Sequence, residues 1–283
     1  MSVQTACRQQ VEFGNQLWIV VKIDQNSFAI NALDVHDMVA MPPLTRLPGA
    51  DKFLSGTINH RGQIVPLVDF RVLLGRKSIA ETAESLCSLI DQREDDHRNW
   101  LDQLELSVKE QREFSLATDP RKCAFGKWYD SYTTDDLVLQ GLLRKFDTPH
   151  RTIHAIAEKV KKYEVVGEFE AAYTLIEQTR ELELSDMIRL FAEFRQAIRE
   201  QTRRQVAVIL EHEGAQVAFS VDSVDAVEEL SAELITDAAD VFPAEWKNWI
   251  VAIGRRRKTD GLALILDREL FFDLAARVDP SGD

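Results

Sequence analysis

The sequence predicts an α+β protein in which two β segments are separated by an antiparallel four-helix bundle. Short runs rich in β-branched and aromatic residues, bounded by turn residues, occupy the first and the last quarter of the 283 residues. Apolar residues at helical spacing occupy the middle of the chain. We therefore expect a first β subdomain at residues 13–78, an inserted helical domain at 79–202 and a second β subdomain at 203–276.

The two β segments resemble each other in sequence. The run IVPLVD at 64–69 matches LALILD at 262–267, and a short amphipathic tail follows each run. A weak internal repeat of this kind predicts two related β subdomains. The candidate strands are residues 17–23, 28–32, 53–59, 64–69, 206–210, 216–221, 249–253 and 262–267.

The middle segment carries several stripes of apolar residues at i, i+3, i+4 and i+7 spacing, which is typical of amphipathic helices. The pairs Asp119-Pro120 and Thr148-Pro149 each predict a helix start, because proline is favoured directly after an N-cap residue. Four helices with short connections predict an antiparallel bundle. Such a bundle returns the chain to the side where it entered, which suits an insertion at a surface loop.

Charge and cysteine content exclude several classes of protein. The chain has 34 Lys and Arg against 47 Asp and Glu, a net charge of −13, and is a poor candidate for nucleic-acid binding. Its one basic cluster, 255–258, precedes a Thr-Asp-Gly turn and predicts a solvated hairpin tip. Without a long apolar run or a secretory signal, we expect a cytoplasmic protein with no direct membrane insertion. Three cysteines argue against a disulfide framework.

Four residues of the helical segment form a candidate metal site. His150 and His154 are four residues apart and therefore share one face of a helix. His97 lies on the apolar stripe of the first helix, and Cys123 lies in the first turn of another. Three imidazoles and one thiolate make the closed tetrahedral donor set that zinc prefers, so we expect bound Zn²⁺.

Other interpretations of these histidines remain open. Each one alone is well explained as a hydrogen-bonded core residue. A di-iron bundle would need repeated Glu-x-x-His pairs, and only Glu94 before His97 fits that pattern. A zinc hydrolase would need an open metal position, and no H-E-x-x-H motif or nucleophile elbow is present, so we do not expect an enzyme. The remaining histidines lie in the β segments, and we expect them at the surface or in loops: His36, His60 and His212.

The helical segment resembles the chemoreceptor zinc-binding (CZB) domain over roughly residues 80–200. The resemblance is carried by three motifs: H-x-x-W at 97–100, CAFGKWY at 123–129 and H-x-x-x-H at 150–154. It implies a four-helix bundle that holds zinc through three histidines and one cysteine. The matching residues outside the ligand set are expected to pack around the site: Trp100, Phe125, Gly126 and Trp128.

The flanking β segments resemble the CheW-like adaptor domain. The run FLSGTINHRGQIVPLVD at 53–69 and the VDSV at 221–224 carry this resemblance. It implies a pair of SH3-like β-barrel subdomains, interrupted after Gly75 and resumed near Arg203. It also implies a scaffold that joins the cytoplasmic tip of a chemoreceptor to a CheA-type histidine kinase.

Together these resemblances predict a cytoplasmic chemotaxis adaptor that senses zinc or oxidants through its insert. Its partner-binding residues are expected in the turn formed by Asn59, Arg61 and Gly62, since a rigid turn tipped with arginine is a good contact point. A second hypothesis is an adaptor whose zinc is purely structural. A third is a zinc-dependent hydrolase. Whether the protein forms a homodimer is open.

Overall fold

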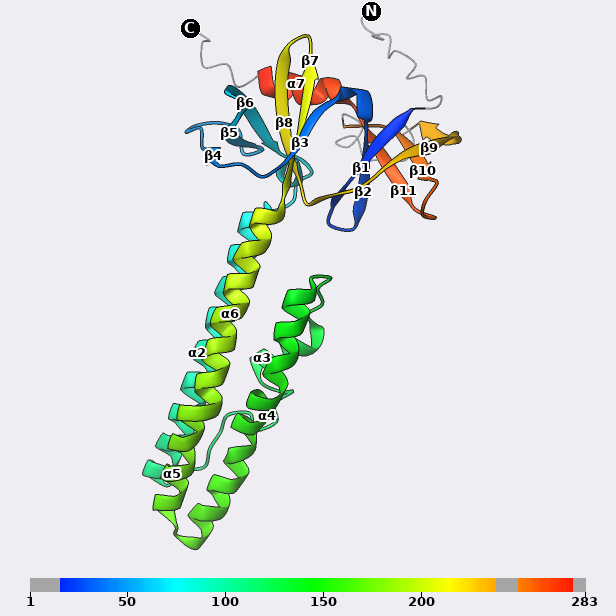
Figure 1. The fold of residues 1–283 in the computed structure, drawn as a ribbon. Coiled ribbons are helices and arrows are strands. Elements are labelled where there is room, and N and C mark those ends of the chain that lie inside the picture. The colour runs from blue at the N-terminus through cyan, green and yellow to red at the C-terminus, as the bar shows by residue number, and fades with distance from the viewer. Residues whose placement is uncertain (1–15, 238–248, 277–283) are drawn as a thin grey trace, which may run out of the picture. The chain divides into compact units, whose positions relative to one another are not determined.

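The computed structural model describes residues 16–237 and 249–276, and side chains within 16–230 and 249–276 (Figure 1). The predicted start of the first β subdomain at residue 13, and Cys7, lie outside the described residues. The chain divides into two compact units. One contains the residues up to Ser78 together with those from Arg203 onward, and the other is Ile79–Thr202.

The first sheet of the β unit is a closed barrel of five strands in the order β1-β2-β11-β10-β9. All its neighbours are antiparallel except β2 and β11, which run parallel with Leu264 opposite Phe28. The strands are β1 (Leu17–Ile23), β2 (Asn26–Asn31), β9 (Ser223–Asp237), β10 (Ile250–Arg256) and β11 (Leu262–Leu266).

The second sheet has six strands in the order β3-β7-β8-β6-β5-β4. Its one parallel pair joins β6 to β8, with Leu67 opposite Ala218. The strands are β3 (Val35–Ala40), β4 (Leu44–Thr45), β5 (Leu54–His60), β6 (Gln63–Asp69), β7 (Val206–His212) and β8 (Ala215–Val221). Short helices complete the unit: η1 (Ala32–Asp34), α1 (Phe70–Leu73) and α7 (Arg268–Ala276).

The two sheets do not follow the two β segments of the sequence. Each segment begins with a hairpin, β1–β2 or β7–β8, and that hairpin joins the sheet built by the other segment. Residues 13–78 and 203–276 were each expected to form one β subdomain; the fold has two β sheets, and strands from both segments contribute to each sheet. The predicted repeat is visible in the structure, because β6 leads into α1 as β11 leads into α7.

The exchange of hairpins gives the two sheets a common hydrophobic core. Phe70 of α1 is fully buried and lies edge-on to three aromatic rings. Its ring centroid is 4.9 Å from that of Phe28 in the barrel, 5.8 Å from Phe219 in the six-stranded sheet and 5.7 Å from Phe271 in α7. Aromatic pairs in this geometry stabilise a core beyond the area that they bury.

The basic cluster at 255–258 lies at the β10–β11 turn with three exposed residues, as predicted, but its fourth residue, Arg256, is not solvated. Arg256 is buried, and its guanidinium contacts the carboxylates of Glu228 at 2.7 Å and Asp225 at 2.6 Å. Arg257 pairs with Glu229 of the same strand at 2.5 Å. The acidic strand β9 lies beside β10 in the barrel, so opposite charges that are distant in sequence neutralise one another.

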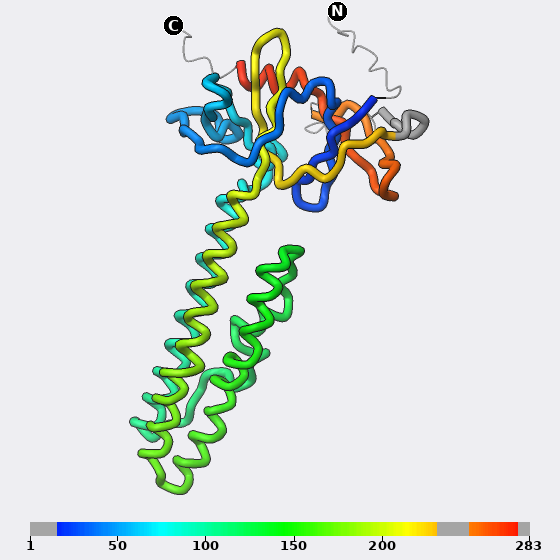
Figure 2. The backbone as a smooth tube through the Cα atoms, in the orientation of Figure 1, coloured from blue at the N-terminus to red at the C-terminus, as the bar shows by residue number. Residues whose placement is uncertain are grey.

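The helical unit has three long helical segments and one short helix of only eight residues. The predicted bundle of four helices is therefore not confirmed. The long α2 (Ile79–Glu110) is followed by α3 (Ala124–Ser131) and α4 (Leu137–Val166). The third long segment runs without a break through α5 (Phe169–Thr179), a π-helical turn η2 (Arg180–Leu184) and α6 (Ser185–Gln201), and ends in η3 (Thr202–Arg204). Figure 2 shows the start of α2 beside the end of α6.

Neither proline pair begins a helix. Pro149 lies inside α4, which starts instead after Asp136, whose Oδ1 accepts hydrogen bonds from the amides of Val138 and Leu139. Asp119 forms a local turn, and the N-cap of the next helix is Cys123. One interior proline removes a single backbone bond, which a helix of 30 residues with a buried face can tolerate.

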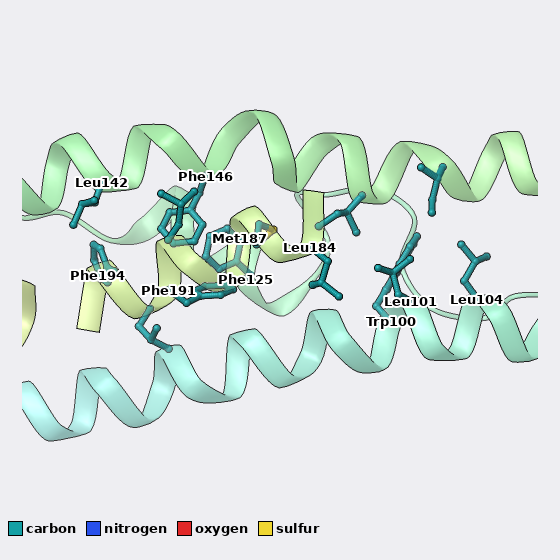
Figure 3. Close-up of a cluster of buried hydrophobic side chains, with 14 of the residues drawn as sticks. Trp100, Leu101, Leu104, Phe125, Leu142, Phe146, Leu184, Met187, Phe191 and Phe194 are labelled. Atoms are coloured by element: carbon teal, nitrogen blue, oxygen red, sulfur yellow. The ribbon is translucent and has the colours of Figure 1, made fainter. Parts of the chain in front are cut away.

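Aromatic and aliphatic side chains from every helix of this unit meet in one core (Figure 3). Phe125 of α3, Phe146 of α4 and Phe191 of α6 are each at most 1% exposed, and their rings lie 4.8–5.5 Å apart. Phe125 of this core also packs against the rings of His97 and His150, with centroids 5.5 Å and 4.8 Å away. Among the described residues, no helix combines the length and apolar composition that a membrane span needs.

Candidate metal centre

The four residues predicted as metal ligands come together within the helical unit. His97 projects from α2, His150 and His154 lie one turn apart on α4, and Cys123 caps the N-terminus of α3. One ligand atom from each residue lies within 4.8 Å of all the others. The three histidines are buried and the cysteine is partly buried. Three helices thus contribute to a single cluster.

Backbone carbonyls determine which ring nitrogen faces the cluster in two of the histidines. His97 Nδ1 lies 2.7 Å from the carbonyl oxygen of Arg93, and His154 Nδ1 lies 3.1 Å from that of Ala117. Because a carbonyl only accepts, each Nδ1 must carry the proton and donate it. Each Nε2 is then left with a lone pair, and both are buried without a hydrogen-bond partner.

Cys123 is held by the first turn of its own helix. The amide of Gly126 donates to its Sγ at 3.2 Å, and the protonated thiol can donate to the carbonyl of Pro120 at 3.3 Å. The same sulfur lies 3.2 Å from His150 Nε2. A helix N-terminus favours negative charge, so the position suits a thiolate once a cation is present.

Burial keeps the metal-free cluster uncharged near neutral pH. It lowers the pKa of His97, and, with the neighbouring imidazoles, it lowers the pKa of His150 to about 3. Burial likewise lowers the pKa of His154 to about 4, with a further contribution from His97. Burial also raises the pKa of the Cys123 thiol, while backbone amides of α3 oppose that shift. The imidazoles therefore offer lone pairs without first losing a proton.

These residues fit a zinc ion. Buried polar atoms without partners are rare in folded proteins, and here two imidazole nitrogens without partners belong to one cluster with a thiol. Three nitrogens and one sulfur match the donors of closed, tetrahedral zinc sites. The Nδ1–H bonds to carbonyls are the outer contacts that usually orient zinc-binding histidines.

Two parts of this site were not predictable from side-chain patterns. The acceptors of His97 and His154 are backbone carbonyls, and no residue type signals them. Trp100, expected only to pack, also donates from its indole Nε1 to Ala117 O at 2.8 Å. Gly126 is required by close approach, since a Cβ at this position would lie 1.9 Å from Pro120 O.

The turn predicted to bind a partner is a tight hairpin between β5 and β6. Arg61 and Gly62 have φ of 51° and 89°, and the Asn59 side chain accepts a hydrogen bond from the Gly62 amide at 2.9 Å. The Arg61 side chain is 73% exposed and touches Asp37 at 2.8 Å. His60, expected at the surface, is buried beside the same aspartate, because it shares the buried face of β5 with Ile58.

The fold and the cluster define a β unit of two sheets with a helical insert that carries a candidate zinc centre. Comparison with known families matches residues 17–97 and 181–276 to the CheW-like domain, and residues 97–161 to the chemoreceptor zinc-binding domain. The first match covers well over half of the chain. The chain therefore belongs to the CheW-like domain family and carries a chemoreceptor zinc-binding domain inserted between the two CheW halves.

Two curated relatives support the CheW-like part of this assignment. The chain is 32% identical over 69 residues to the chemotaxis protein CheW of Rhizobium meliloti (strain 1021), a match that covers 24% of this chain and 44% of the relative. It is 30% identical over 70 residues to the probable chemotaxis protein CheW of Rhizobium etli, covering 25% and 45%. The chain thus spans less than half the length of the relatives that it matches.

Among solved structures, the scaffolding protein TtCheW from Thermoanaerobacter tengcongensis aligns with this chain. The alignment covers 89% of this chain and 84% of the other, with 11% sequence identity and a TM-score of 0.42.

Proposed function

We propose that this chain is a cytoplasmic chemotaxis adaptor that docks a chemoreceptor tip and a CheA-type histidine kinase through its β unit and senses zinc or oxidants through its insert. The observation that carries this proposal is the buried cluster of three histidines and one cysteine within a domain that interrupts a CheW-like fold. His97, Cys123, His150 and His154 are the proposed ligands. A closed set of four leaves no position for a substrate water, which argues against a hydrolase.

Among the four proposed ligands, Cys123 is the one suited to sensing. It is the least buried of the four ligands and the only one that common oxidants convert readily. A zinc ion held by these four residues would supply the positive charge that keeps this sulfur as a thiolate. Hydrogen peroxide would oxidise the thiolate to a sulfenic acid and be reduced to hydroxide, which would remove the thiolate ligand and weaken the cap of α3.

The connection that leads into the insert is held by a buried arginine of the β unit. Arg71 donates from Nε to the carbonyl of Lys77 at 3.2 Å, two residues before α2 begins. Its other nitrogens contact Asp24 at 2.5 Å and Asp222 at 2.6 Å, and Asp24 also pairs with Arg76. These contacts tie the connection to the β1–β2 turn and to the link between β8 and β9. A change at the start of α2 would therefore reach both sheets.

The proposal is tested by the binding of a CheA-type kinase fragment to the purified chain, either loaded with zinc, treated with a chelator or treated with hydrogen peroxide. We expect chelation to change the affinity of the wild type several-fold, about 1 kcal/mol, which is typical of coupled sites. Peroxide is expected to change the kinase affinity of the wild type as chelation does. It should leave the affinity of Cys123→Ser unchanged, because peroxide does not oxidise a serine hydroxyl as it does a thiol.

Cys87→Ser is the matched control, because Cys87 lies in α2 outside the cluster and is 1% exposed. It is expected to respond to peroxide as the wild type does. If zinc content differs fully between loaded and chelated protein while kinase affinity stays the same, the insert is a structural staple and the sensing part of the proposal is wrong.

Docking is expected to depend on Arg61. Arg61→Ala should weaken binding of the kinase or the receptor tip about tenfold or more, as exposed arginines at interface centres commonly do. Its effect on the free energy of unfolding should stay below about 1 kcal/mol, because the pair with Asp37 is largely exposed on the arginine side. Binding by calorimetry and unfolding in urea check the two parts. Arg255→Ala, an exposed arginine of the barrel, serves as control, and an equal loss in both variants would contradict the assignment.

A further inference from the structure

One backbone carbonyl near the metal centre accepts two hydrogen bonds. The oxygen of Ala117 lies 2.8 Å from Trp100 Nε1 and 3.1 Å from His154 Nδ1. Trp100 is 4% exposed and His154 is 2% exposed, so water has little access to either donor. A carbonyl oxygen has two lone pairs and can accept both bonds at once. The indole and the imidazole therefore share one acceptor.

The two histidines that donate to carbonyls depend on different parts of the chain. His97 finds its acceptor one turn earlier in its own helix, at Arg93. His154 finds its acceptor 37 residues away, in the loop between α2 and α3. The orientation of His97 thus follows from helix geometry, whereas that of His154 requires the loop to be held in place.

Trp100 holds this loop at two points. Its indole N–H binds the Ala117 carbonyl, and its ring lies edge-on to Phe114 with centroids 5.0 Å apart. The same ring lies 4.9 Å from that of His154. Phe114 and Ala117 both belong to this loop, residues 111–123, so the Trp100 side chain fixes the loop close to the Ala117 carbonyl and thereby its direction.

We infer that Trp100 is a positioning residue for the metal centre, a role that rests on the zinc site of the proposed function. Its indole N–H keeps the Ala117 carbonyl turned toward His154. The carbonyl then keeps the proton of that imidazole on Nδ1 and the lone pair of Nε2 toward the cluster. Without the indole N–H, the carbonyl is free to turn away, and the imidazole can move its proton to Nε2, where it blocks metal binding.

The test is Trp100→Phe in the full chain, which keeps an aromatic ring and removes the N–H donor. The tautomer of His154 is read in metal-free protein by ¹⁵N–¹H correlation spectra of histidine-labelled samples, and zinc affinity by competition with a chromophoric chelator. We expect the wild type to show the Nδ1–H form and the variant to gain the Nε2–H form. Zinc affinity should fall about tenfold or more, as changes to outer contacts of zinc histidines do.

Trp128→Phe is the matched control. Trp128 packs in the same core, 5.6 Å from the ring of Phe125 and 6.0 Å from that of Phe194, and is not the donor to Ala117. It should leave the His154 tautomer unchanged. Should Trp100→Phe fold poorly, site-specific replacement of Trp100 by the benzothienyl analogue of tryptophan removes the N–H at nearly constant shape.

Two results would overturn the inference. One is an unchanged tautomer together with a zinc affinity within about twofold of the wild type, well below the usual effect of an outer contact. The other is an equal loss in Trp100→Phe and Trp128→Phe, which would indicate general packing. If the wild type binds no zinc but Trp100→Phe still changes the tautomer of His154, the proposed zinc site is refuted and the positioning of His154 by Trp100 remains intact.

Discussion

Replacement of His150 by alanine is expected to abolish zinc binding by this protein. His150 is central to the cluster: its Nε2 lies 3.2 Å from the Cys123 sulfur, and its ring centroid lies 5.1 Å from that of His97 and 4.9 Å from that of His154. Loss of a ligand should cost more than the roughly hundredfold that removal of an outer contact costs. Metal content of the purified protein should fall from about one zinc per chain to nearly none.

The same change should remove the part of the stability that zinc contributes. A ligand present at about a thousand times its Kd stabilises the folded state by about 4 kcal/mol. The melting temperature of His150→Ala should therefore be the same with and without zinc, whereas that of the wild type should fall on chelation. Because His150 is buried, metal-free variant and metal-free wild type must also be compared, to separate the cavity from the metal.

His212→Ala is the control, since this histidine lies in β7 and outside the cluster. It should retain about one zinc per chain. Full metal content in His150→Ala, or equal losses in both variants, would show that zinc binds elsewhere or through fewer ligands.

Gly126→Ala is expected to destabilise the insert strongly and to disturb the metal centre. A Cβ at this position would lie 1.9 Å from the oxygen of Pro120 and 2.9 Å from its carbonyl carbon. These are backbone atoms, so α3 or the preceding loop must move. Overpacking of this kind costs about 1–3 kcal/mol or more. The Gly126 amide also donates to the Cys123 sulfur, so zinc affinity should fall together with stability.

Gly141→Ala offers a matched control in the same unit. Gly141 lies inside α4, and an added Cβ would have no atom within 4 Å. Alanine is the better helix former, so this variant should be more stable by about 0.5–1 kcal/mol. Urea unfolding followed by tryptophan fluorescence compares the two variants. Similar stabilities for both would contradict the close approach at Pro120.

The four residues of the candidate metal site could be predicted from the sequence, but the hydrogen bonds that orient them could not. The spacing of four between His150 and His154 places both on one face, because helix periodicity acts within a single turn. The motif around Cys123 identified the fourth ligand. The carbonyl of Ala117 and its bond to Trp100 join residues from three parts of the chain, and no local pattern reports such a contact.

In the β unit, too, the contacts between neighbouring residues could be predicted and those between distant residues could not. The hairpins that open each half were predictable, because pairing within a hairpin depends on neighbouring residues. Their exchange between the two sheets was not, since it depends on which apolar face meets which core. Strand β9 was missed because its buried Glu228 looks like a surface charge until Arg256 is placed beside it.

The sequence by itself determined that this protein has a β fold interrupted by helices, that four side chains of the insert are candidate zinc ligands, and that its segments resemble two known domains. These properties depend on residue types and on spacings of a few residues. Only the tertiary structure decided which strands share a sheet, how many long helical segments form the insert and which carbonyls orient the histidines. Each of these depends on contacts between residues far apart in the chain, where packing of the whole core, rather than local preference, selects the partner.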